Sequence, residues 1–206
     1  MSEGSQDRIS LDEVTAVILA GGRGRRMGGM DKGLVDLEKR PLIAHVLNAI
    51  VPQAGSVLIN ANRNAEKYRE FGYRIVSDTL DDYQGPLAGF VSAMAVASTP
   101  YIVTLPCDGP LVPTDYVQRM INALEMSENE IAVAHDGDRI QPVYALLPVG
   151  LMSDLEAFLA EGDRKINLWY SRRHVALADF SDCPEAFRNI NTPGERDRLQ
   201  RERAIT

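Results

Sequence analysis

The residues best suited to chemistry in this sequence lie in one glycine-rich stretch, LAGGRGRRMGGMDK, which runs from position 19 to position 32. Its five glycines allow backbone N–H groups to approach a ligand closely, because no Cβ intervenes and a positive φ costs little. Four cations stand there against the single acid Asp31: Arg23, Arg25, Arg26 and Lys32. In a chain of net charge −7, such a loop predicts a small polyanion as ligand, most simply the phosphate chain of a nucleotide.

This loop differs from the two commonest phosphate-binding motifs. A Walker A motif carries lysine and then Ser or Thr directly after its last glycine, whereas Met30 and Asp31 follow Gly29 here. A Rossmann fingerprint has a third glycine where Met27 stands, and it expects an acid at the end of the second strand, where this chain has Asn60. From the loop alone, a surface turn with solvated arginines remains an alternative.

Polar side chains also follow three apolar segments that are predicted to be strands. Asn60, Asp78 and Asp108 stand at the ends of these segments. Ligands of open α/β sheets bind outside the carboxyl ends of the strands, so we expect these side chains near the glycine loop. Because Mg²⁺ binds proteins through one or two carboxylates plus substrate phosphates, Asp108 is the predicted anchor of a magnesium–nucleotide complex. An Asx turn is the alternative role for Asp108.

Two further features would act on phosphates. Lys32 closes the loop and would serve as a mobile point charge on phosphate oxygens, with plain solvation as the alternative. The stretch GPLAG, which ends at Gly89, opens a predicted apolar helix that extends to about residue 97. The amino-terminus of a helix supplies partial positive charge and free N–H donors to a bound anion.

Alternating strand and helix patterns must position these residues. Strands are predicted at 14–19, 56–60, 74–77, 101–105, 131–134, 143–147 and 174–180. Helices are predicted at 42–50, 65–71, 85–97, 114–126, 151–161, 165–172 and from 193 onward. This order predicts an α/β fold, a Rossmann-like, mostly parallel, doubly wound sheet with helices on both faces, the later strands covering one edge. We expect one domain over residues 1–206, with 1–12 as a flexible extension.

Composition narrows the function classes. The chain has 206 residues, is 45% hydrophobic and 25% charged, and suits one globular domain. Its acidity argues against nucleic acid as a partner, and no apolar stretch is long enough to predict a membrane span. Cys107 and Cys183 are isolated, which favours reduced thiols, and the polar first ten residues lack an export signal. We therefore expect a cytoplasmic protein.

Several motifs in series resemble a known family. The segments LAGGRGRRMGGMDKGLV, NANRN, SDTLDDYQGPLAG, LPCDGPLVP and NINTP resemble the molybdenum cofactor guanylyltransferase family of the nucleotidyltransferase superfamily, from about Val14 to Pro193. The family transfers GMP from GTP to the terminal phosphate of molybdopterin and releases pyrophosphate. The resemblance therefore implies GTP and molybdopterin as substrates and Mg²⁺ as cofactor. It also implies transient contacts with other proteins of molybdenum cofactor biosynthesis and with molybdoenzyme chaperones.

The same resemblance implies roles for single residues. The GTP-binding residues would be Leu19, Ala20, Gly21, Gly22, Lys32, Asn60, Asp78, Gly89 and Asp108. Asp108 would hold the metal and would act in catalysis with Lys32 and Arg26. Asn189 and Asn191 of the NINTP segment, with Arg164 and Lys165, would form the molybdopterin side. The alternative for the two asparagines is that they cap the following helix.

Rival functions differ in the nucleotide or in the class of protein. Cytidylyltransferases of the superfamily tend to carry Ala-Gly where Gly21 and Gly22 stand, so the resemblance favours guanine over cytosine. The pair Arg23-Gly24 departs from the Lys-Ala that is common in the family. A sugar-phosphate nucleotidyltransferase is a further alternative. A GTP-binding regulatory module is disfavoured, since the chain has neither a Walker A lysine nor an Asn-Lys-x-Asp motif.

Overall fold

The structure is a computed structural model that describes residues 8–20, 31–79, 85–126 and 128–204. A seven-stranded sheet forms its centre, in the order β5-β4-β1-β6-β8-β7-β9. The strands are β1 (Val14–Leu19), β4 (Ser56–Asn60), β5 (Arg74–Val76), β6 (Tyr101–Pro106), β7 (Ile131–His135), β8 (Ile140–Pro148) and β9 (Val175–Asp179). Strand β8 runs antiparallel to both of its neighbours, and every other pairing in this sheet is parallel. The mostly parallel sheet predicted from the sequence is thus confirmed.

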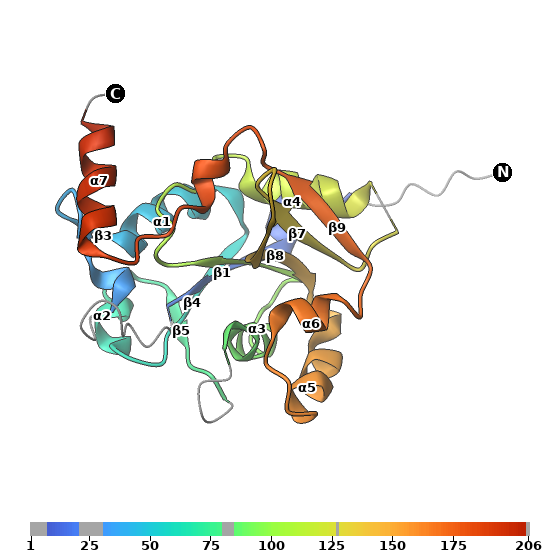
Figure 1. The fold of residues 1–206 in the computed structure, drawn as a ribbon. Coiled ribbons are helices and arrows are strands. Elements are labelled where there is room, and N and C mark those ends of the chain that lie inside the picture. The colour runs from blue at the N-terminus through green and yellow to red at the C-terminus, as the bar shows by residue number, and fades with distance from the viewer. Residues whose placement is uncertain (1–7, 21–30, 80–84, 127, 205–206) are drawn as a thin grey trace.

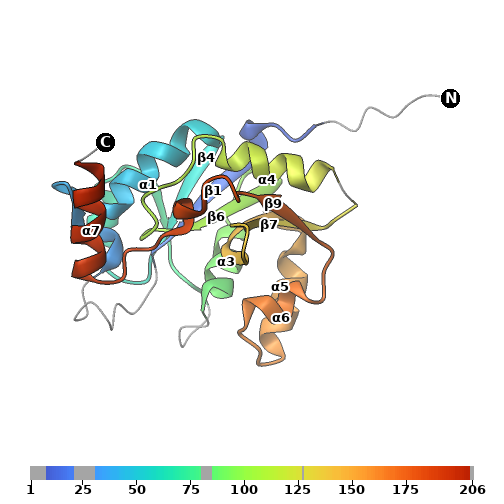
Figure 2. The same cartoon turned by 45° about the horizontal axis from the view of Figure 1, so that its top comes forward.

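Helices cover both faces of the sheet (Figures 1 and 2). Helices α1 (Leu42–Ile50) and α4 (Tyr116–Glu125) lie on one face, and α3 (Pro86–Met94), α5 (Met152–Ala160) and α6 (Ile166–Tyr170) lie on the other. Helix α2 (Ala65–Arg69) precedes β5, and α7 (Pro193–Arg203) ends the described chain. Short 3₁₀ helices occur at Leu11–Glu13, Lys32–Leu34, Val51–Gln53, Val149–Leu151 and Pro184–Phe187.

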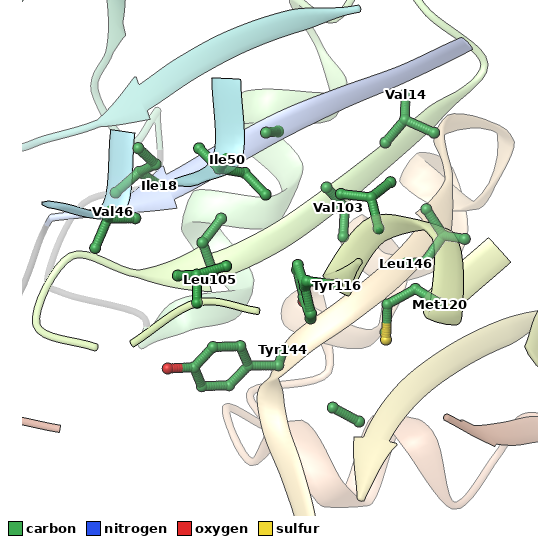
Figure 3. Packing of buried hydrophobic residues seen from close by; sticks show 14 of the residues in the cluster. Val14, Ile18, Val46, Ile50, Val103, Leu105, Tyr116, Met120, Tyr144 and Leu146 are labelled. Atoms are coloured by element: carbon green, nitrogen blue, oxygen red, sulfur yellow. The ribbon is translucent and has the colours of Figure 1, made fainter. Parts of the chain in front are cut away.

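Alternation along β1 explains how one strand serves two cores. Val14, Ala16 and Ile18 are fully buried against α1 and α4, whereas Val17 faces the cluster beneath α3 and α5. Successive side chains of a strand point to opposite faces, so a continuous apolar run indicates a strand covered on both sides. Figure 3 shows the first of these clusters, in which residues of β1, β6 and β8 pack against α1 and α4.

The later strands extend the sheet at one edge. Strand β8 pairs with β6, β7 pairs with β8, and β9 pairs with β7, so the three continue the sheet beyond β6. They therefore lie at one edge of the parallel strands, as predicted. A hydrophobic pattern specifies which faces of a strand are buried, and it carries no information on which neighbour the strand joins.

Two local features were not predicted. Strands β2 (Asp36–Leu37) and β3 (Arg40–Pro41) form a small hairpin, whose turn places Glu38 and Lys39 at φ of 53° and 64°. Glycine or asparagine usually marks such turns, and neither residue stands at position 38 or 39. Near the start of the described chain, Ile9 packs against the core, and its backbone N–H donates to Glu125 Oε1 at 2.6 Å. Ile9 and Leu11 thus contact the hydrophobic core.

No helix within the described ranges is long and apolar enough to cross a membrane.

Candidate functional site

The carboxyl ends of three parallel strands meet at one rim of the sheet. Leu19 at the end of β1 is in register with Asn60 of β4 on one side and with Pro106 of β6 on the other. Two backbone bonds continue this pairing past the strands: Ala20 N–H donates to the Asn60 carbonyl at 2.8 Å, and Cys107 N–H donates to the Leu19 carbonyl at 3.1 Å. The glycine loop therefore begins between Asn60 and Asp108, as the sequence predicted.

An ion pair lies at the centre of this rim. Lys32 Nζ donates to Asp108 Oδ2 at 2.9 Å, and the same ammonium donates to Asn191 Oδ1. The Asp108 side chain is 9% exposed and that of Lys32 is 25% exposed. One cation thus joins the glycine loop, the end of β6 and the segment before α7. In the described part of the chain no backbone N–H bonds the Asp108 carboxylate, so an Asx turn does not account for this residue.

The segment before α7 is fixed beside Asp108 by a backbone hydrogen bond. The Ile190 N–H donates to the Asp108 carbonyl at 2.8 Å, while the Ile190 side chain is fully buried with Leu37 and Leu42. The cap of α7 is Thr192, whose Oγ1 accepts from the Glu195 N–H at 3.2 Å. The amide side chain of Asn191 is therefore free of the capping role and bonds to Lys32 instead.

A second polar cluster lies at the ends of β4 and β5. Asp78 Oδ1 accepts from Asn60 Nδ2 at 2.8 Å, and Asp78 Oδ2 accepts from Asn62 Nδ2 at 2.6 Å. The Asp78 N–H returns a bond to Asn62 Oδ1 at 2.7 Å. Gly89 of α3 packs directly over this cluster, since a Cβ there would stand 2.6 Å from Asn60 Oδ1 and 2.9 Å from Leu19 Cδ2. Asn60, Asp78, Gly89 and Leu19 are thus brought together.

Two buried polar atoms on the other side of Asp108 have no hydrogen-bond partner within the described residues: Tyr144 Oη and Asn189 Oδ1. Both face Gly109, where a Cβ would stand 2.3 Å from the tyrosine oxygen and 3.3 Å from the asparagine oxygen. Burial, and then the nearby Asp108, raise the pKa of Tyr144, so its hydroxyl stays protonated. The Asn189 amide oxygen is thus a buried acceptor that no described residue satisfies, close to Gly109 and so to the residue after Asp108.

Arg164 and Lys165 lie apart from the two asparagines. The Arg164 guanidinium donates to the carbonyls of Leu159 at 2.5 Å and Asp163 at 2.7 Å, at the end of α5. Its own carbonyl lies near Gly85, just before α3, and Lys165 is exposed. Among the described contacts, none joins either cation to Asn189 or Asn191. The predicted residues Gly21, Gly22 and Arg26 lie outside the described residues.

Sequence reasoning missed residues that are held in these clusters. Asn62 shares the carboxylate of Asp78 with Asn60, and the spacing of two asparagines in NANRN was the available signal. Tyr144 is contributed by β8, which is distant in sequence from Asp108, so no local pattern could identify it. Asp31 and Tyr68 form a further pair, described below.

The donor set around Asp108 suits a hard divalent cation. Within the described ranges, no group of three or more His, Cys, Asp or Glu side chains could hold a metal alone. A single buried carboxylate with one oxygen not bonded to described residues fits an ion that takes its other ligands from substrate phosphates and water. Cys107 next to it is no nucleophile, because burial, and then Asp108 and Asp31, raise the pKa of its thiol well above the usual value.

Comparisons with known proteins identify the family. The sequence profile of the MobA-like NTP transferase domain matches residues 16–176. The molybdenum cofactor guanylyltransferase of Shewanella halifaxensis is 51% identical over 187 residues, which cover 91% of this chain and 94% of that protein. The corresponding protein of Shewanella baltica is 48% identical and covers 92% of this chain and 97% of its own length.

A solved structure shares the fold. Molybdopterin-guanine dinucleotide biosynthesis protein A from Archaeoglobus fulgidus superposes with a TM-score of 0.74 over 94% of this chain and 100% of that chain, at 22% identity. The profile match spans most of the chain, and relatives with about half of their residues identical span nine-tenths of it. This chain therefore belongs to the MobA-like nucleotidyltransferases, within the molybdenum cofactor guanylyltransferase family.

Proposed function

We propose that this enzyme transfers GMP from GTP to the terminal phosphate of molybdopterin, forming molybdopterin guanine dinucleotide and pyrophosphate. The observation that carries the proposal is the Lys32–Asp108 pair at 2.9 Å, which also contacts Asn191. A nucleotidyl transfer needs a nucleotide, a countercharge and an acceptor in one place. Here the loop, the carboxylate and the predicted acceptor segment converge on one ammonium. Family membership supports guanine as the base.

The nucleotide would lie across the ends of β1 and β4. Leu19 and Ala20 would contact it through the backbone, and the Asn60–Asp78 cluster would face the nucleoside. The glycine loop, with Gly21 and Gly22, would lie against the phosphates, where Lys32 supplies charge. Gly89 would allow α3 to pack closely against Asn60 and Leu19, which keeps the Asn60 amide in place for the nucleoside.

Magnesium is the metal that we propose at Asp108. The carboxylate would hold the ion together with phosphate oxygens and water, as is usual for Mg²⁺ at nucleotide sites. When bound, the ion would neutralise negative charge on the triphosphate and on the leaving pyrophosphate. The Lys32 ammonium, now on Asp108 Oδ2, would then contact the phosphates.

The transfer itself requires positioning and countercharge. A terminal phosphate oxygen of the acceptor attacks the α-phosphorus of GTP in line, the bond from that phosphorus to the β-phosphate bridging oxygen breaks, and pyrophosphate leaves. The acceptor phosphate is ionised near neutral pH, so no general base is needed. Lys32 and Arg26 would offset the negative charge that develops on the phosphates. The protonated thiol of Cys107 takes no covalent part.

Molybdopterin would approach from the side of Asn189 and Asn191. The unpartnered amide oxygen of Asn189 supports this assignment, because a buried polar atom without a partner is costly until a ligand or water satisfies it. Arg164 and Lys165 would contribute from the opposite end of the rim, near the start of α3. Lys165 is the better candidate of the two, since the Arg164 guanidinium already bonds two carbonyls.

The proposal is tested by identifying the product. The enzyme is incubated with molybdopterin, Mg²⁺ and each of the four nucleoside triphosphates, and the dinucleotide is identified by mass spectrometry. We expect the guanine dinucleotide, and pyrophosphate release from GTP only when the acceptor is present. A cytosine dinucleotide would contradict the nucleotide assignment. GTP hydrolysis that is independent of the acceptor would contradict the reaction and favour a regulatory GTP-binding module.

We further propose a cytoplasmic location and transient contacts with other proteins of molybdenum cofactor biosynthesis and with molybdoenzyme chaperones. Both cysteines are free thiols in the structure, which fits a reducing compartment. The partner contacts have their support in the family alone.

A further inference from the structure

The residue directly before Lys32 is held by side chains of a distant element. Tyr68 Oη, on α2, donates to Asp31 Oδ1, and Asn64 Nδ2, just before α2, donates to Asp31 Oδ2 at 3.0 Å. Both carboxylate oxygens of Asp31 are therefore occupied. Asp31 is 9% exposed and Tyr68 is fully buried, so these bonds are shielded from water. These two hydrogen bonds, which we call the Asp31 anchor, attach the end of the glycine loop to α2 and its preceding residue.

The residue directly after Lys32 is also confined. A Cβ on Gly33 would stand 2.6 Å from Tyr68 Oη and 3.1 Å from Cys107 Sγ. The backbone at Gly33 therefore passes between the tyrosine of α2 and the residue that precedes Asp108. Lys32 is fixed on both sides, by the Asp31 carboxylate on one and by this narrow passage on the other. Its side chain then reaches Asp108 Oδ2 at 2.9 Å.

The negative charge of Asp31 explains why its carboxylate needs hydrogen-bond donors. Asp31 is buried, and Cys107, the residue before Asp108, lies across Gly33 from Tyr68. A buried carboxylate is unfavourable unless hydrogen bonds satisfy it. Tyr68 and Asn64 supply these bonds, and burial followed by the influence of Cys107 and Asp31 raises the pKa of Tyr68, which keeps its hydroxyl a donor.

We propose that Asp31, held by Tyr68 and Asn64, is a positioning residue that fixes the backbone of Lys32 so that its ammonium meets Asp108 and the phosphates of GTP. A lysine has a long side chain with considerable rotamer freedom, and a fixed backbone reduces the number of places that it can reach. The inference rests on the proposed function, in which Lys32 contacts the triphosphate.

The first test compares two buried tyrosines. Tyr68→Phe removes the hydroxyl that bonds Asp31, and Tyr116→Phe removes a hydroxyl that donates to the Thr104 carbonyl at 2.8 Å. Both tyrosines are fully buried, so the two variants lose comparable contacts. We expect kcat/KM for GTP to fall about tenfold in Tyr68→Phe, the scale of a hydrogen bond to a charged group, and to change less than about twofold in Tyr116→Phe. Equal values for the two variants would overturn the inference.

A double-mutant cycle shows whether Tyr68 acts through Lys32. In a Lys32→Ala background we expect Tyr68→Phe to cause no further loss of kcat/KM, because the positioned group is already absent. Independent, additive losses would overturn the inference and indicate a general structural role. If Tyr68→Phe does not fold, Asp31→Asn takes its place in the same cycle. Lys32→Ala with wild-type turnover would contradict the proposed function itself, whereas an impaired Lys32→Ala beside an unaffected Tyr68→Phe contradicts only the positioning role.

Discussion

At the scale of single residues, the polar groups of this rim are held by hydrogen bonds to one another. The Asp78 carboxylate accepts hydrogen bonds from the side-chain amides of Asn60 and Asn62. The backbone N–H of Asp78 donates to the side-chain oxygen of Asn62. The oxygen of the Asn60 amide is left facing Gly89. Groups fixed in this way lose little freedom when a ligand binds, which favours both affinity and correct placement.

Gly89→Ala tests this placement. A Cβ at residue 89 would lie 2.6 Å from Asn60 Oδ1 and 2.9 Å from Leu19 Cδ2, so the Asn60 amide must move. Alanine is otherwise the better helix residue, so the substitution acts against the site and not against α3. We expect the Kd for GTP to rise about tenfold or more by isothermal titration calorimetry. Gly150→Ala is the matched control, because nothing lies within 4 Å of a Cβ there. Unchanged GTP affinity in Gly89→Ala would contradict the proposal that the nucleoside binds at this cluster.

At the scale of elements, one arginine fastens α4 to the chain that follows β9. The Arg119 guanidinium donates to both oxygens of Asp182, at 2.6 and 2.8 Å, and lies 5.1 Å from the centre of the Phe180 ring. It also bonds Asp115 at the start of α4, at 2.7 Å. This contact joins a helix on one face of the sheet to the chain that follows the edge strand.

The pH dependence of stability follows from this contact. The hydrogen bond from Arg119 is the main cause that lowers the pKa of Asp182 to about 2. A lowered carboxyl pKa contributes stability that is present above the unfolded value, near pH 4, and is lost as the pH falls toward 2. The urea concentration at the unfolding midpoint should fall between pH 4 and pH 2 in the wild-type protein. We expect it to fall less over the same range in Asp182→Asn. A wild-type pH profile in this variant would contradict the assignment.

The elements also show how far the sequence could predict the structure. Apolar runs with β-branched residues predicted the strands, and strand ends predicted the positions of Asn60 and Asp108, because parallel strands end at one rim. The hairpin at residues 36–41 escaped prediction, since Glu38 and Lys39 adopt left-handed backbone conformations that these residue types rarely adopt. The direction of β8 also escaped, because burial patterns are the same in both strand directions.

Parts of the site could not be predicted for a related reason. Asp31 is held by Tyr68, which is 37 positions away, and Tyr144 reaches Gly109 from β8. Contacts between distant elements depend on the packed fold and leave no local spacing in the sequence. Arg164 shows the opposite case, since its charge suggested a ligand contact whereas the structure places its guanidinium on carbonyls at the end of α5.

At the scale of the whole molecule, one sheet separates two apolar clusters that share its strands. β1 contributes Ile18 to the cluster under α1 and α4, and Val17 to the cluster under α3 and α5. Unfolding of either cluster would expose one face of strands whose other face is buried in the second cluster. We therefore propose that the chain unfolds as one cooperative domain.

Trp169, the single tryptophan of the chain, provides the test of cooperativity. It is fully buried in the cluster under α3 and α5, so its fluorescence reports on that side of the sheet, whereas far-ultraviolet circular dichroism reports on all helices and strands. We expect the two urea transitions to coincide, with the same midpoint and the same slope. Separate transitions would show that the two sides unfold independently and would contradict the single domain.

We propose that nucleotidyl transfer occurs at the rim where Lys32 meets Asp108. The most direct test is the rate of molybdopterin guanine dinucleotide formation by Asp108→Asn. Asparagine keeps the shape and an acceptor for Lys32 and removes the negative charge. Asp136→Asn is the control, because Asp136 also precedes a glycine and its carboxylate bonds backbone N–H groups of the Asp136–Arg139 turn. We predict a folded Asp108→Asn protein with a rate at least about 100-fold lower, the scale of removing a preorganised electrostatic contact, and a near-normal rate for the control. Near-normal product formation by folded Asp108→Asn would contradict the claim.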